Sequence, residues 1–132
     1  MRNQEHQIRA AGLIAALSSA VLVAACGCYD TAVSELTVEP PTPCLELSLP
    51  STVSNCAMNG NSLEITGTNA CDATLVIPGD YRDYPHEGVD LTVPPGGDVS
   101  YDIGYASSPG SQQYDIVCEL GDATVVLSFT GP

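Results

Sequence analysis

Lysine and tryptophan are absent from this 132-residue sequence, which holds only three arginines and two histidines. Sixteen Asp and Glu residues give it a formal net charge of −13. Nucleic acid binding is excluded, because phosphates need lysine or arginine partners. An anionic membrane surface would repel the chain for the same reason. A cation, a basic protein or a glycan is compatible with this charge, which also keeps a protein soluble.

Side chains that exchange protons near neutral pH are scarce, since His86 is the only histidine after residue 9. The sequence contains no Gly-x-Ser-x-Gly motif, in which the serine acts as a nucleophile. It also contains no Cys-x-x-Cys pair of the kind that zinc ribbons use. We therefore expect no enzyme, because general acid–base catalysis depends on such groups.

The N-terminal part combines Arg2 and Arg9 with a run of sixteen uncharged and mostly apolar residues, 10–25. A membrane-spanning helix needs about 20 apolar residues. A basic start, a shorter apolar run and small residues at its end are typical of an export signal. Residues 1–25 are therefore predicted to be a signal peptide that is removed.

The run ends in Val23-Ala24-Ala25-Cys26, an aliphatic residue and two small residues before a cysteine. This resembles the lipobox of bacterial lipoproteins, over residues 1–26. The resemblance implies cleavage before Cys26, a diacylglycerol on its thiol and an acyl chain such as palmitate on the new amino group. Several acyl chains hold a protein at a membrane stably, where one does not. Gly27 stands where Asp would imply retention at the inner membrane, so the expected location is the outer membrane of a Gram-negative bacterium. The alternative is an ordinary export signal.

Residues 26–43 are expected to form a lipidated anchor and tether. Pro40, Pro41 and Pro43 restrict the backbone of this segment to extended conformations. The folded domain is then expected at residues 44–132.

Within 44–132, apolar and polar residues alternate with a period of two, which is typical of half-buried strands. Turn residues separate most of the runs. Seven short strands at this spacing predict an all-β, antiparallel sandwich with its core on the apolar parity of each run. The runs are 45–49, 63–65, 75–77, 89–93, 99–103, 114–120 and 125–129.

Two cysteines fall on the inward parity of these runs, Cys71 counted from Leu63 and Cys118 counted from Tyr114. Two inward cysteines on different strands resemble the inter-sheet disulfide of immunoglobulin-like domains, and the resemblance covers residues 44–132. It implies a Cys71–Cys118 bond. The absence of tryptophan and the presence of Ile116 two residues before Cys118 depart from antibody domains.

Two further cysteines, Cys44 with outward parity and Cys56 in a Ser/Asn/Gly-rich segment, are expected to close a surface loop. Disulfides are the first interpretation of cysteines in a small exported domain. A Cys56–Cys71 bond is the alternative to both pairs. With Cys26 lipidated, five cysteines remain, so one of them stays unpaired or pairs with another molecule.

The segment 80–90 gathers four carboxylates, two tyrosines and the only Arg and His of the predicted mature chain. Calcium prefers several carboxylate and carbonyl oxygens, so this segment is the candidate metal site. Its spacing does not match an EF-hand loop. Without a cation four acids repel one another, and we expect them to splay into water, with Arg82 paired to a neighbour and no cofactor bound. The candidate ligands are Asp80, Asp83, Glu87 and Asp90.

These features predict a non-enzymatic, lipid-anchored protein of the cell envelope. Its sandwich would bind an unknown protein or glycan or serve as a structural component. The alternatives are a calcium-dependent binding or adhesion module and a small exported enzyme.

Overall fold

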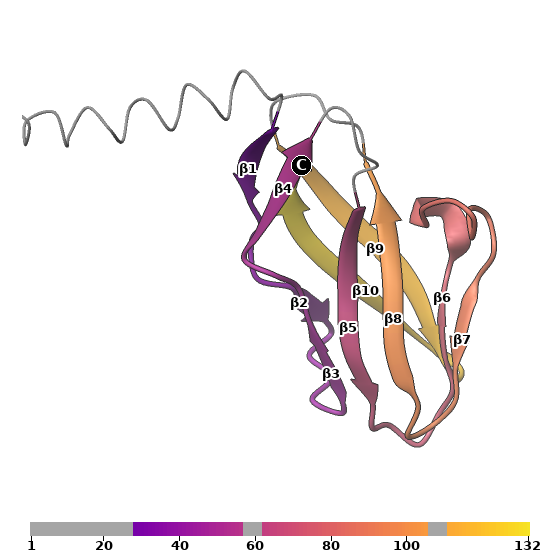
Figure 1. The fold of residues 1–132 in the computed structure, drawn as a ribbon. Coiled ribbons are helices and arrows are strands. Elements are labelled where there is room, and N and C mark those ends of the chain that lie inside the picture. Colours follow the sequence, from indigo (N-terminus) through magenta and orange to yellow (C-terminus); the bar gives the residue numbers. More distant parts are fainter. Residues whose placement is uncertain (1–27, 57–61, 106–110) are drawn as a thin grey trace, which may run out of the picture.

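A computed structural model describes residues 28–56, 62–105 and 111–132. The predicted signal peptide and Cys26 lie outside the described residues. The fold is all-β, with antiparallel sheets in a sandwich-like arrangement (Figure 1), as the alternation predicts. Its elements are β1 (Cys28–Ala32), β2 (Thr37–Glu39), β3 (Leu45–Ser48), β4 (Thr52–Cys56), β5 (Ser62–Asn69), β6 (Leu75–Ile77), the 3-10 turn η1 (Gly79–Tyr81), β7 (Leu91–Val93), β8 (Asp98–Gly104), β9 (Gln112–Leu120) and β10 (Ala123–Gly131).

The strands form a five-stranded sheet, a three-stranded sheet and a two-stranded ribbon. The first has the order β2-β10-β9-β6-β7, the second β3-β5-β8, and the ribbon pairs β1 with β4. In Figure 1, β5 and β8 lie in front of β9 and β10. The two larger sheets pack through the apolar faces that alternation creates.

The core follows the predicted parity. Fully buried side chains come from both sheets: Leu63, Ile65, Tyr101 and Ile103 from the smaller one, and Leu75, Ile77, Ile116 and Leu127 from the larger one. Val89 is the exception, because β7 begins only at Leu91 and the Val89 side chain is 55% exposed. The run predicted at 89–93 is therefore a shorter strand preceded by a loop.

Residues 28–43 differ from the expected tether, because they contain two strands that pair with strands of the folded domain. β1 pairs with β4 and β2 pairs with β10. Val33 between them is buried, and its amide donates to the Ser51 carbonyl at 2.9 Å. Burial of the apolar side chains in this segment stabilises the fold, whereas an extended tether would leave them in water. The prolines follow β2 and do not interrupt it.

The structure contains a Cys44–Cys71 disulfide, so the predicted Cys71–Cys118 and Cys44–Cys56 pairs are both wrong, and so is the alternative Cys56–Cys71. Cys71 and Cys118 are both buried, as parity predicted, but Cys118 is a free thiol.

Strand pairing explains this outcome. β5 ends at Asn69, which lies opposite Leu45 at the start of β3, and the Ala70 amide donates to the Cys44 carbonyl at 2.8 Å. The two cysteines therefore flank one end of the smaller sheet, with Cα atoms 4.9 Å apart. Closing a loop of 27 residues should stabilise the fold by about 3.5 kcal/mol on the chain-entropy estimate.

A buried asparagine, Asn69, connects the two larger sheets. Its side chain is fully buried and its amide nitrogen donates to the carbonyls of Ala73 at 2.9 Å and Val93 at 3.1 Å. Its side-chain oxygen accepts from the Cys71 amide at 3.1 Å. Because Asn69 ends β5 and Val93 ends β7, one amide group joins strands of opposite sheets.

We predict that Asn69→Leu, which preserves side-chain size but makes no hydrogen bond, lowers the free energy of unfolding by about 2–4 kcal/mol, because buried polar partners lose their bonds. Urea denaturation measures this. The control is Thr66→Ala at an exposed position of the same strand, which should change stability by less than about 0.5 kcal/mol. Equal effects from both variants would contradict the connecting role of Asn69.

Candidate functional site

The loop between β6 and β7, residues 78–90, is folded back on itself at Gly79. The Gly79 carbonyl accepts from the amides of Arg82 at 3.1 Å and Gly88 at 3.0 Å. Its amide donates to Asp90 Oδ1 at 3.0 Å. A Cβ atom at position 79 would lie 2.3 Å from the Val89 nitrogen, so only glycine allows this close approach.

Arg82 fixes this loop against the smaller sheet. Its backbone forms a bridge with Ile103 of β8, and its guanidinium carbon lies 5.5 Å from the Tyr101 ring centroid. Nη1 donates to the Val89 carbonyl at 3.0 Å, whereas Nε is buried without a hydrogen-bond partner among the described residues. Arg82 thus pairs with a neighbour as expected, through a carbonyl and a cation–π contact.

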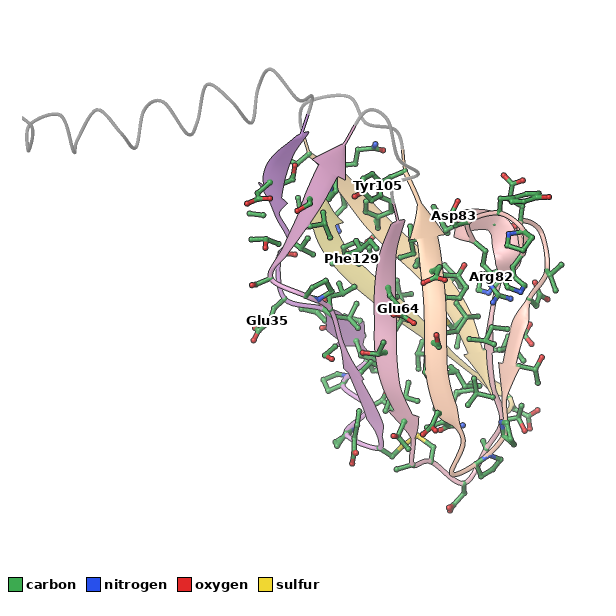
Figure 2. The ribbon with its side chains drawn as sticks, in the orientation of Figure 1. Glu35, Glu64, Arg82, Asp83, Tyr105 and Phe129 are labelled. Atoms are coloured by element: carbon green, nitrogen blue, oxygen red, sulfur yellow. A yellow bond between two sulfur atoms is a disulfide. The ribbon has the colours of Figure 1, made fainter. Side chains whose placement is uncertain are left out.

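A hollow of about 470 Å³ opens between this loop and the end of β8. Figure 2 shows Arg82, Asp83 and Tyr105 around this end of the molecule. A Cβ atom at Gly104 would lie 3.0 Å from Asp83 Oδ1, so this glycine leaves the room that the carboxylate occupies. The lining residues are Asp80, Tyr81, Arg82, Asp83, Glu87, Gly104 and Tyr105.

The structure does not bring the four predicted calcium ligands together. Asp80, Asp83 and Glu87 share the hollow, but Asp90 closes the neck of the loop and lines a separate, smaller hollow beside Val117. Asp83 Oδ1 accepts from the Tyr84 amide at 2.9 Å. Within 28–56, 62–105 and 111–132, no three His, Cys, Asp or Glu side chains are placed to hold a metal ion.

The acidic residues of the hollow are predictable from the sequence, whereas Gly104 and Tyr105 are not. Both follow from the bridge between Arg82 and Ile103, a contact between distant segments that composition does not encode. The Asp83 amide also donates to the Asp102 carbonyl at 3.0 Å, which places the loop beside the end of β8. The signal that would have identified them is the alternation of β8, which ends at this edge.

We predict that low-millimolar calcium in physiological salt leaves the melting temperature of the protein unchanged. A site as weak as in extracellular modules, with a Kd on the order of 10⁻⁴–10⁻³ M, would raise it by mass action. Differential scanning fluorimetry with and without a chelator measures this. An increase that disappears in an Asp83→Asn, Glu87→Gln double variant would instead establish a calcium site.

Two other groups in the core are held in their neutral forms. Burial raises the pKa of the Cys118 thiol to about 12 and is also the main cause that raises the pKa of Tyr101 to about 12. The Tyr101 hydroxyl donates to the Pro78 carbonyl, so this buried phenol positions the start of the loop. Below pH 9 the Cys118 thiol is protonated in both the folded and unfolded states. As the pH rises from 9 through about 12 the unfolded state loses the proton first, so stability falls over that range.

We predict that Cys118 in the native protein resists iodoacetamide at pH 9, because only the exposed thiolate reacts and this thiol is buried and protonated. Mass spectrometry should find it modified only after denaturant is added. Rapid modification of Cys118 in native wild type, at a rate near that in denaturant, would show that β9 opens readily.

Comparisons with protein-family models, with curated proteins and with solved structures find no match for this chain. No helix in the described part of the chain has the length and apolar character needed to cross a membrane.

Proposed function

We propose that this chain is a non-enzymatic lipoprotein of the cell envelope, with a β-sandwich that acts as a binding module or a structural component. The observation that carries the proposal is the motif Val23-Ala24-Ala25-Cys26 at the end of an uncharged run. The first strand begins at Cys28, two residues after the proposed lipidated cysteine. The proposed anchor and the folded module therefore adjoin each other in the chain.

The spacing between anchor and fold determines how the module would sit at a membrane. Gly27 is the only residue between Cys26 and β1, and each extended residue spans at most about 3.6 Å. The β1–β4 ribbon would therefore lie within roughly 10 Å of the lipid attachment point. In Figure 1 the start of β1 lies at one end of the molecule and the turn between β7 and β8 at the other. That turn would face away from the membrane.

A role in binding is supported by the loop 78–90. Tyr81 is 37% exposed and lines the hollow with the carboxylates. Tyr84 is 81% exposed and follows Asp83 of that lining, to which its amide donates. Exposed aromatic rings beside acidic groups suit a basic protein segment or a glycan, because such rings provide contact area at small entropic cost.

A non-enzymatic role is supported by the chemistry of the same region. His86 is exposed on the loop, and the Cys118 thiol is buried with a pKa of about 12. Neither is arranged as an activated nucleophile with an adjacent base.

We also propose that the sandwich is immunoglobulin-like in the broad sense. The support is the run of alternating strands over 44–132, packed as two sheets. An inter-sheet disulfide is not part of this proposal, because Cys71 is bonded to Cys44.

We predict that a clickable palmitate analogue labels the wild-type chain in a bacterial host and that Cys26→Ala abolishes this label. We also expect Cys26→Ala to remove the chain from the membrane fraction. Cys28→Ser, two residues away, is the matched control and should keep the label. In-gel fluorescence and density-gradient fractionation measure both properties, and the gradient separates outer from inner membrane. Persistent labelling of Cys26→Ala would refute the lipid anchor.

A further inference from the structure

The β1–β4 ribbon places two cysteines directly opposite each other. The strands are antiparallel with five paired positions, and Cys28 faces Cys56 at the end of the register. Within the ribbon, the Ser54 hydroxyl donates to Asp30 Oδ1 at 3.0 Å, and Ser54 and Asp30 are also partners in the register. A side-chain contact thus supports the register that aligns the cysteines.

We propose that Cys28 and Cys56 form a disulfide that closes this end of the ribbon. Directly opposed residues of antiparallel strands have Cα atoms about 4.5 or 5.5 Å apart, and disulfides require about 4.4–6.8 Å. Strand alternation puts both positions on the face that Asp30 and Ser54 occupy. The backbone therefore satisfies the distance requirement whichever kind of pair this is.

The remaining cysteines leave few other partners. Cys44 and Cys71 are bonded to each other, and Cys118 is fully buried inside the sandwich as a free thiol. Under the proposed function Cys26 carries lipid. Cys28 and Cys56 are then the two cysteines left, and they are neighbours in the structure.

The ribbon has a physical need for a cross-link. In the described part of the chain neither of its strands pairs with a strand of the two larger sheets, and an isolated two-stranded ribbon is marginally stable in water. Its apolar contacts with the core come from Val53 of β4 and from Val33, beyond the opposite end of β1 from Cys28. A bond at Cys28 would secure the end that lies next to Cys26.

The bond forms by oxidation of both thiols. The two cysteines lose two protons and two electrons, and a disulfide reagent accepts them and becomes two thiols, through a mixed disulfide. In an envelope compartment the oxidant would be a dithiol–disulfide oxidoreductase, and in vitro it is oxidised glutathione. Such bonds persist in exported proteins, so the bond in cells rests on the proposed export, whereas its formation in vitro does not.

Peptide mapping of the full-length chain, purified from host envelopes in detergent, tests the proposal. Free thiols are alkylated first, and the unreduced chain is cut after Asp and Glu. Asp30, Glu46, Glu64 and Asp72 then separate Cys28, Cys44, Cys56 and Cys71 into different peptides. We expect the peptide that ends at Asp30 to be joined to residues 47–64. Recovery of Cys56 joined to any other cysteine would overturn the proposal.

A second experiment tests the disulfide independently of the proposed export. The full chain is reduced with dithiothreitol and re-oxidised with a mixture of reduced and oxidised glutathione. A Cys28–Cys56 bond that forms in vitro but not in cells supports the disulfide and counts against export. Failure to form it in both experiments overturns the disulfide.

Counts of free thiols in denaturant, made on wild type and on matched cysteine variants, test the bond independently. Six cysteines less one lipidated and four bonded leave one thiol in wild type. Cys28→Ser and Cys56→Ser should each give two, and the double variant should give one again. The same series in a Cys26→Ala background should give identical counts. If wild type gives two and Cys26→Ala gives one, Cys26 is unlipidated while the disulfide stands. A wild-type count of three that falls to two in each single variant would overturn the disulfide, because Cys28 and Cys56 would then both be free.

Discussion

The arrangement of the two larger sheets depends on the buried amide of Asn69. An amide removed from water is costly unless its hydrogen bonds are replaced, and Asn69 replaces them with groups from β7, from the Ala73 carbonyl and from the Cys71 amide. Its backbone also bonds to Gly96 and Gly97 in the turn before β8. The end of β5, the disulfide and this turn are therefore fixed together.

The alternation of apolar residues made the fold class predictable, because a period of two leaves Leu63, Ile65, Tyr101 and Ile103 on one face that must be buried. The same parity correctly placed Cys71 and Cys118 inside. It could not assign their partners, because parity defines the face of a sheet and not the neighbour across it. Cys71 meets Cys44 because β5 pairs with β3, and strands as short as β2 give too few residues for any period to be detected.

The candidate site shows the same division between local and distant information. Composition identified Asp80, Asp83 and Glu87, which do share a hollow. It grouped Asp90 with them because the four are close in sequence, whereas the hydrogen bond from Gly79 holds Asp90 at the neck of the loop. Tyr105 enters the hollow because Arg82 aligns with Ile103. A local count of charges can thus locate a loop but not the surface that the loop completes.

The pairing of β2 with β10 has a consequence for how the chain reaches this fold. The Thr37 hydroxyl bonds to the Ser128 carbonyl, 91 positions later in the sequence, whereas β9 and β10 form a hairpin through adjacent residues. Contacts between residues this distant in sequence slow folding, because the chain loses the entropy of closing a long loop before these contacts stabilise it. While the protein is synthesised from its N-terminus, β2 has no partner until β10 emerges. In that interval, Val33 and Val38 lack the strand that covers this segment in the folded protein, and they are accessible to chaperones, proteases and aggregation.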